Sequence, residues 1–186
     1  PFGFKELEGI HSRTDFDLKQ HQEFSGKKLQ FFDLEAGESY VPYVVETSIG
    51  LDRTFLMILT AAYCEETVGN EERVVLKIPA PIAPIKAAIM PLVKKDGLPE
   101  IAREIINELK FDLTCQYDEK DSIGRRYRRQ DAIGTPFCIT VDHQTIEDKT
   151  VTIRYRDSME QERIPIEKVS KIVREKADVR NLLKKL

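Results

Sequence analysis

The stretch IKAAIMPLVKKDGLPEIAREIINEL, residues 85–109, decides the fold of most of this chain. Residues 85–93 form an apolar run whose pattern alone fits either a strand or a helix. From Gly97-Leu98-Pro99 onward, a proline in the first turn and apolar residues at helical spacing predict an amphipathic helix. Together with the strands around them, these residues are typical of a sheet covered by helices.

The same alternation continues on both sides of that stretch. Helices are predicted from Ser122 to about Ile133 and from Pro165 onward. Strands are predicted at 74–78, 111–117, 137–141 and 151–156, with a polar loop between the last two. The sequence therefore predicts an α/β (α+β) fold, a mixed β-sheet flanked by helices.

The first third of the chain has a different pattern. Residues 5–10 and 39–48 are predicted strands, and Pro42 suggests that the second is an edge or begins late. Residues 51–63 are predicted as a buried helix, and the acidic, polar segment that follows contains Gly69-Asn70. We therefore expect one domain at 1–63, a linker at 64–74 and a second domain at 75–186.

Composition limits the possible functions. The 186 residues are 41% hydrophobic and 33% charged, and no apolar run approaches the roughly 20 residues of a membrane span. The net charge of −3 divides into −7 for residues 1–73 and +4 for residues 74–186. A basic C-terminal part is a weak indication of nucleic-acid binding, and an unevenly charged, solvated surface is the simpler explanation.

Cysteine spacing and the first residues suggest where the protein works. Three cysteines, Cys64, Cys115 and Cys138, give neither a disulfide framework nor a CxxC metal motif. The opening residues lack the basic head and apolar body of a secretory signal, and the missing methionine suggests an excised part of a longer protein. We expect a cytoplasmic protein with no structural metal and no tightly bound cofactor.

Two stretches of the first domain carry groups suited to phosphate chemistry. Residues 46–53 place a carboxylate, a serine and a glycine before a helix whose first turn holds Arg53. Such a helix start favours an anion, although ordinary capping explains it equally well. In residues 6–18, Glu6 and Glu8 share one face of a strand and are suited to Mg²⁺, or the charges form a surface ladder. No nucleophile–base pair is visible, so no catalytic residue is predicted.

A third stretch concentrates positive charge. Four arginines fall within residues 125–129, on a predicted helix where they repel one another. An RNA backbone would relieve that repulsion, and Tyr127 would stack on a base or belong to the core. On the strand at 151–156, Arg154 and Arg156 share the face opposite the apolar one. A basic RNA-binding surface and a solvated face remain equal alternatives.

Taken together, these stretches resemble a known family, the bacterial-type, dimeric class II glycyl-tRNA synthetases. The resemblance covers essentially the whole chain and matches the family's C-terminal part, the end of a catalytic domain plus an anticodon-binding domain. It is carried by the motifs ELEGI (6–10), RTDFDL (13–18) with His21, ETSIGLDR (46–53), the run from LKIP (76–79) to GLPEIA (97–102), GRRYRRQD (124–131) and GTP (134–136).

The resemblance implies specific roles. Glycine would be bound by Glu46, Thr47, Ser48, Ile49 and Gly50, with the glutamate on the amino group and the serine excluding larger amino acids. ATP, a substrate with Mg²⁺ near Glu6, would contact Glu6, Leu7, Gly50, Leu51, Asp52 and Arg53. The tRNA anticodon would meet six residues, chosen for their charge and position rather than from a family motif: Arg125, Arg126, Arg128, Arg129, Arg154 and Arg156.

The implied partners are tRNA(Gly), glycine and ATP, and the parent enzyme is expected to be a homodimer that binds neither membrane nor DNA. The parent would form glycyl-adenylate and transfer glycine to tRNA. Class II motifs 1 and 2 are not found, so we expect this chain alone to be inactive, with half a site. The alternatives are a stand-alone RNA-binding module, a class II synthetase for another small amino acid, and a protein-binding module.

Overall fold

The computed structural model describes residues 3–184 and divides into two compact units between Met57 and Ile58. Helix α2 (Leu51–Ala62) contains this boundary. In the part of the chain described, no helix is both long enough and apolar enough to cross a membrane.

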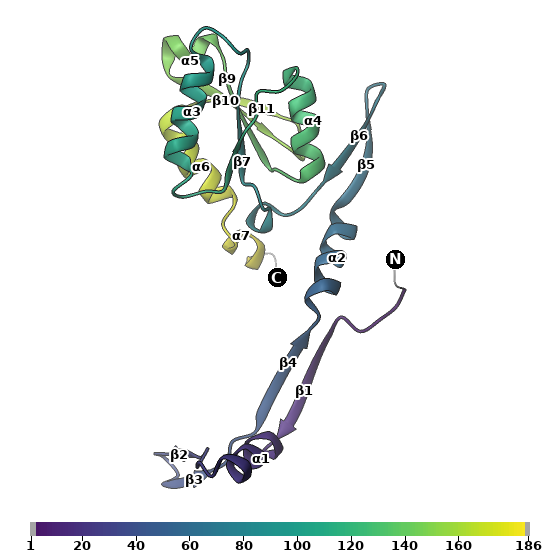
Figure 1. The fold of residues 1–186 in the computed structure, drawn as a ribbon, viewed down its shortest axis with the longest axis vertical. Coiled ribbons are helices and arrows are strands. Elements are labelled where there is room, and N and C mark those ends of the chain that lie inside the picture. Colours follow the sequence, from purple (N-terminus) through teal and green to yellow (C-terminus); the bar gives the residue numbers. More distant parts are fainter. Residues whose placement is uncertain (1–2, 185–186) are drawn as a thin grey trace. The chain divides into compact units, whose positions relative to one another are not determined.

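The first unit is built on an antiparallel strand pair. Strand β1 (Glu8–Thr14) pairs with β4 (Val44–Ile49), and the chain between them forms α1 (Phe16–Ser25) and the short hairpin of β2 (Phe31–Asp33) and β3 (Glu38–Tyr40) (Figure 1). The predicted strand at 39–48 is interrupted around Pro42, because proline lacks the N–H that pairing requires. Helix α1 was not predicted, since its apolar residues follow no helical period.

The helix predicted to be buried is exposed over most of its length. The α2 side chains of Leu51 and Phe55 are 82% and 62% exposed, and in this helix only Ala62 is buried. The expectation of a buried helix is therefore wrong for this structure. The apolar spacing gave the helix correctly, but burial needs a covering layer, and residues 3–57 supply only two-stranded sheets.

The second unit contains a five-stranded mixed sheet in the order β11-β10-β9-β7-β8. Its strands are β7 (Ala87–Pro91), β8 (Cys115–Tyr117), β9 (Phe137–Val141), β10 (Thr150–Tyr155) and β11 (Gln161–Pro165). Strands β8 and β9 run parallel to β7 on either side of it, whereas β10 is antiparallel to both of its neighbours. The predicted mixed sheet flanked by helices is confirmed.

Helices cover both faces of this sheet (Figure 1). Helices α3 (Leu98–Leu109) and α6 (Val169–Lys176) pack on one face, where the main core includes Ile89, Ile139 and Ile153. Helix α4 (Ile123–Ile133) packs on the other face, over Ala88, Met90 and Cys138. Because β7 is buried on both faces, its whole sequence is apolar, and the open choice at 85–93 resolves as a strand.

Several shorter elements differ from the prediction. The polar loop after β9 contains helix α5 (His143–Asp148), which a reciprocal capping box between Asp142 and Thr145 begins. Edge strand β11 occupies residues for which no strand was predicted, and α6 begins after a short 3-10 turn, η2 (Ile166–Lys168), rather than at Pro165. A 3-10 turn, η1 (Ala80–Ile82), precedes β7, and the short helix α7 (Arg180–Leu183) follows α6.

Residues 64–74, interpreted as a linker, are mostly regular structure. They form much of a hairpin of β5 (Tyr63–Val68) and β6 (Glu71–Leu76), with Gly69-Asn70 as its turn. Strand β6 lies against α4, and the backbone N–H of Lys77 donates to the Ala62 carbonyl at 2.7 Å. The glycine–asparagine pair, read as a break between domains, is typical of a tight hairpin turn.

Candidate functional site

Helix α4 holds one of its arginines inside the protein. The side chain of Arg126 is 3% exposed, and its guanidinium donates to the carbonyls of Pro91 and Asp121, the latter from Nε at 3.0 Å and from Nη2 at 2.7 Å. These bonds tie the start of α4 to the end of β7. Arg126 therefore supports the loop before α4 and does not contribute charge to the surface.

The two arginines of the strand region are buried as well. Arg154 makes a two-pronged contact with the carboxylate of Asp131 on α4, at 2.8 and 3.0 Å. Arg156 donates to the Gly134 carbonyl at 2.7 Å and to Asp157 at 2.7 and 3.0 Å. Both side chains are less than a tenth exposed. The alternation of β10 correctly placed Arg154 and Thr152 on one face, but α4 covers that face.

The expectation of one basic surface built from six arginines is therefore corrected. Arg126, Arg154 and Arg156 are buried and fully engaged with carbonyls and carboxylates. Burying a charge is unfavourable unless it is compensated: Arg154 and Arg156 pair with carboxylates, and backbone carbonyls accept the hydrogen bonds of Arg126. Sequence pattern identifies the helix and strand faces but not which of them another layer covers.

Three of the six arginines keep an accessible guanidinium. Arg125 is exposed and makes no ion pair with the residues described; Arg128 contacts Glu71 of the hairpin at 2.9 Å. Arg129 is held by Asp118 at 3.0 and 3.1 Å. Burial would raise the pKa of Asp118, but the hydrogen bonds and charge of Arg129, together with the hydrogen bond from the Lys120 N–H, outweigh it and lower that pKa below its usual value. Arg129 is thus oriented rather than free.

Tyr127 belongs to the protein interior. Its hydroxyl lies 2.7 Å from Thr140 Oγ1, and the Arg154 guanidinium lies over its ring at 4.8 Å. Burial raises the pKa of Tyr127. Tyr127 was expected either to stack on a base or to belong to the core. The structure supports a place in the core, because a face of its ring is already in contact with a cation.

Topology brings together three lysines that sequence reasoning missed, beside the carboxylates of the same loops. The parallel strands β7, β8 and β9 end at one edge of the sheet, which is where open α/β sheets usually bind ligands. The loops after β7 and β8 carry the exposed lysines Lys94, Lys95 and Lys120. Lysine directly after a predicted strand is the signal that could have identified them, but only the parallel arrangement brings the loops together.

In the first unit, the strand register places Glu46 and Ser48 on one face. On β1, His11 lies opposite Glu46 and Gly9 lies opposite Ser48, so all four share that face. A Cβ atom on Gly9 would collide with the His11 imidazole. Thr47 and Ile49 point to the other face, so the predicted five-residue glycine segment is divided between two faces of the strand pair.

Arg13 is a neighbour of this face that sequence reasoning left in a surface charge ladder. Its Nε lies 3.7 Å from Glu46 Oε2, while its guanidinium binds the two oxygens of Asp17 at 2.8 and 2.9 Å. The hydrogen bond from Arg13 lowers the pKa of Asp17. Asp17 therefore holds the Arg13 guanidinium near the Glu46 carboxylate.

The predicted ATP residues also come together. Arg53 Nη1 donates to the Glu6 carbonyl at 2.6 Å, and the Gly50 N–H approaches the Leu7 carbonyl at 3.5 Å. Gly50, Leu51 and Asp52 begin α2 and are exposed, as is the Glu6 residue. The structure thus brings the start of α2 beside residues 6 and 7. The side chains of Glu6 and Asp52 are exposed to solvent.

Comparison with known proteins identifies the second unit. Residues 86–176, which contain the five-stranded sheet with α3, α4 and α6, match the family model described as an anticodon binding domain. The resemblance to glycyl-tRNA synthetases is confirmed. This chain is 54% identical to the glycine–tRNA ligase of Chlorobaculum tepidum over 173 residues, which is 93% of the chain and 37% of that protein.

Other glycine–tRNA ligases agree with this result. The identity is 54% with the ligase of Treponema denticola over 187 residues, 97% of the chain and 41% of that protein. It is 53% with the ligase of Caldanaerobacter subterraneus subsp. tengcongensis, over 95% of the chain and 38% of that protein. The chain thus spans about two fifths of the length of these relatives, and its likeness to synthetases includes the first unit as well as the anticodon-binding domain.

Proposed function

We propose that this chain is part of a glycine–tRNA ligase and that residues 75–186 bind the anticodon of tRNA(Gly). The observation that carries the proposal is the edge where β7, β8 and β9 end, within the matched anticodon-binding domain. Exposed Lys94, Lys95, Lys120 and Arg125 surround that edge, and Arg129 is oriented beside it. These cations suit phosphates, while bases of a single-stranded loop can be read by the adjoining polar groups.

The first unit carries half of a glycine and ATP site in this proposal. The Glu46 carboxylate is suited to the ammonium group of glycine, and Ser48 on the same face limits the space at Cα. Arg53 and the start of α2 are suited to the ATP phosphates, with Mg²⁺ near Glu6. The parent enzyme, a cytoplasmic homodimer, would form glycyl-adenylate and then esterify the tRNA.

The exposed apolar residues of the first unit support the view that this site needs more protein. Phe16, Phe24, Leu51 and Phe55 are each more than half exposed, and several large apolar side chains left exposed indicate contact with another protein layer. Because class II motifs 1 and 2 are missing from the sequence, the chain alone should not form glycyl-adenylate. An ATP–pyrophosphate exchange assay on the chain should stay at background.

RNA binding tests the anticodon assignment directly. The chain is titrated with tRNA carrying a glycine anticodon and with the same tRNA carrying a changed anticodon, at two salt concentrations. We expect preference for the glycine anticodon, and weaker binding at higher salt in proportion to the phosphate contacts. Arg125→Ala should reduce affinity by about tenfold or less. Arg174→Ala is the matched control, because that exposed arginine lies on α6, on the opposite face of the sheet.

Each outcome separates this proposal from its alternatives. Equal affinity for both anticodons, or equal losses with Arg125→Ala and Arg174→Ala, would leave only a basic surface. Absence of RNA binding at both salt concentrations would contradict the proposal and favour a protein-binding module. In the longer ligase, exchange with alanine, serine or proline instead of glycine would indicate a synthetase for another small amino acid.

A further inference from the structure

Strand β6 follows one strip of helix α4. Residues 125, 128, 131 and 134 recur every three positions along the helix and its C-terminal cap, so each neighbours the next in a row that winds obliquely across the helix surface. Glu71 of β6 contacts Arg128, Arg73 contacts Asp131, and the Leu76 carbonyl lies against Gly134. Arg125 continues the strip toward the helix start and has no partner on the hairpin among the residues described.

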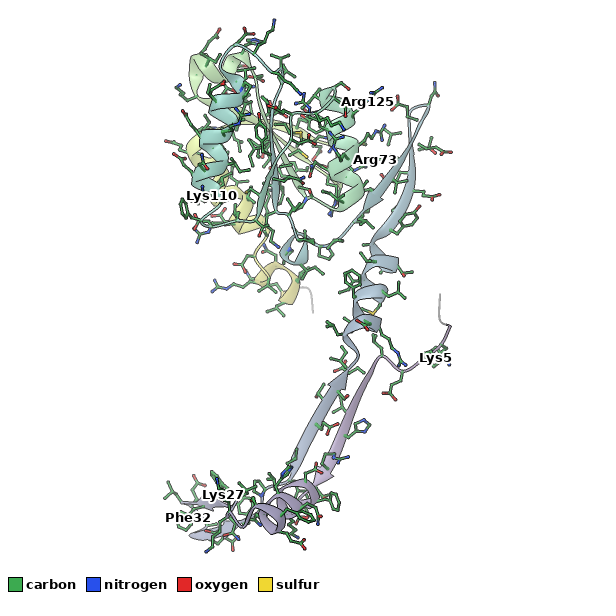
Figure 2. The ribbon with its side chains drawn as sticks, viewed as in Figure 1. Lys5, Lys27, Phe32, Arg73, Lys110 and Arg125 are labelled. Carbon is green, nitrogen blue, oxygen red and sulfur yellow. The ribbon has the colours of Figure 1, made fainter. Side chains whose placement is uncertain are left out.

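The central contact of this strip is a buried ion network. Arg73 and Asp131 are each completely or almost completely buried, and Arg73 Nε donates to Asp131 Oδ2 at 3.0 Å. The other nitrogens of Arg73 bind Glu66 at 2.7 Å and the Arg156 carbonyl at 2.5 Å. Arg73 therefore joins the hairpin, helix α4 and the end of β10 through one planar group. Figure 2 shows Arg73 in the region where β6 faces α4.

The contact at the end of α4 is equally restrictive. Gly134 has φ +85°, and a Cβ atom there would lie 3.2 Å from the Leu76 carbonyl oxygen and 3.1 Å from Ile78 Cδ1. Only glycine combines this backbone conformation with so close an approach. The hairpin thus contacts α4 at its middle, in its last turn and at its C-terminal cap.

On its other side, α4 rests on a small apolar cluster. Partly buried Ile123 and Tyr127 meet Ala88, Met90 and Cys138 of the sheet. The main core lies on the opposite face and contains no residue of α4. Apart from this cluster and the polar contacts of Arg126, Arg129 and Asp131 with the sheet and its loops, the element that packs against α4 is β6.

We propose that the hairpin β5–β6 is a rigid support that sets the orientation of α4. In this proposal, Arg73 is a positioning residue for Arg125, the arginine that faces RNA. The proposal rests in part on the anticodon-binding function proposed above. Arg73 does not touch RNA in this view; it acts through Asp131 to place the α4 strip. Rigid placement matters because base recognition depends on geometry, whereas a general attraction for phosphates does not.

The first test needs no RNA. Cys138 lies beneath α4 and is 1% exposed, and burial raises the pKa of its thiol to about 12, so it reacts only when α4 moves away. With Cys64→Ser and Cys115→Ser as background, labelling by a thiol reagent reports on that movement. Arg73→Met should accelerate labelling by at least about tenfold more than its loss of global stability explains. This variant keeps the Asp131–Arg154 pair.

A matched control separates local movement from general destabilisation. Val173→Ala removes buried volume from α6 on the far face of the sheet. Its labelling rate should rise only as far as its urea-measured stability predicts. If the labelling rate of Arg73→Met also rises only as far as its stability predicts, the proposal that the hairpin supports α4 is wrong.

The second test asks whether Arg73 acts through Arg125. In the native chain, Arg125→Ala should weaken binding of the tRNA with the glycine anticodon by up to about tenfold; in the Arg73→Met background the same change should cost less than about twofold. Fully additive effects would overturn the positioning role. If the native chain binds no tRNA, the proposed function fails, and the Cys138 labelling still decides whether β6 controls α4.

Discussion

The two compact units contain the same kinds of secondary structure but differ in what covers it. Among residues 3–57, only Gly9 is buried, while Phe16, Phe24, Phe31 and Phe32 are more than half exposed. In the second unit, β7 and β9 are buried along their whole length between helices. Hydrogen-bonded strands and helices therefore form in both units, but a three-layer core forms in the second alone.

This difference explains which charges the structure holds tightly. The Arg13–Asp17 pair of the first unit has good geometry, yet its side chains are 42% and 28% exposed. Arg73 and Asp131 of the second unit make a similar contact with both side chains fully buried. Water screens the first pair, so that pair contributes little stability. Loss of Asp131 from the second pair would leave Arg154 charged in the interior without its carboxylate, while Arg73 would keep Glu66.

Hydrogen exchange gives the largest expected contrast between the units. Local opening is easy where few apolar contacts close over the backbone, so amides of β1 and β4 in this chain should exchange at least about a thousandfold faster than those of β7 and β9. Exchange followed by mass spectrometry of peptic peptides measures both sets in one sample. Equal protection in the two units would mean that the first unit is covered by another surface in solution, such as a second copy of the chain.

Asp131→Asn should have the next largest effect, a loss of stability confined to the second unit. Removing the charge leaves Arg154 buried without a carboxylate and Arg73 with Glu66 alone, which typically costs about 3–5 kcal/mol. Urea unfolding followed by far-ultraviolet circular dichroism would measure the loss. Asp17→Asn is the matched control in the first unit, and it should leave the main unfolding transition where it is. A small effect at Asp131 would mean that water enters the network when the charge is removed.

Gly134→Ala should reduce the stability of the second unit by about 2–4 kcal/mol, a smaller loss than that expected for Asp131→Asn. The left-handed backbone costs alanine about 1–2 kcal/mol, and the approach to Leu76 adds strain. Gly97→Ala, where φ is +76° but no atom lies within 4 Å, should show the backbone part alone. Gly26→Ala in the first unit has the same open surroundings and should not shift the main transition. Equal effects at Gly134 and Gly97 would show that the hairpin yields to the new methyl group.

Sequence pattern was sufficient where periodicity and end signals agree. The strand at 137–141 is an apolar run because it is buried on both faces. The helix from Leu98 was predicted from its apolar spacing and from Gly97 and Pro99 at its start. Sequence pattern failed at α5, where a capping box rather than apolar spacing defines a helix of six residues. It failed again at Arg126 and Arg154, because a charge pattern looks the same whether the face is in water or beneath another layer.

The candidate site shows the same division between what is local and what is not. Glu46 and Ser48 at alternate positions were predicted to act together, and the strand register places them on one face. His11 and Arg13 reach that face only through the pairing of β1 with β4, and the lysines of the sheet edge meet only through parallel strands. No short stretch of sequence shows which strands pair with each other, so these neighbouring residues could be identified only from the structure.

The smallest expected effect is a difference between the units in how their stability changes at acid pH. Arg163 of β11 binds both oxygens of Asp142 at 2.5 and 2.8 Å and holds the pKa of that carboxyl below its usual value. A carboxyl with a lowered pKa in the folded state contributes stability above its unfolded value, near pH 4, and that contribution disappears as the pH falls through the lower folded value. Asp142→Asn should therefore be less stable than the native chain at pH 7, and the difference should shrink below about pH 4.

The substitution isolates the ion pair because Asn can still accept the hydrogen bond from the Thr145 N–H that begins α5. Urea midpoints of both proteins at pH 7, 5 and 3 give the difference directly, and comparing the two proteins cancels the other carboxyls. Asp17, whose pKa is also lowered but which lies in the exposed pair of the first unit, should show no such difference in the main transition. A gap between native and Asp142→Asn proteins that persists unchanged at pH 3 would mean that the ion pair is not its source.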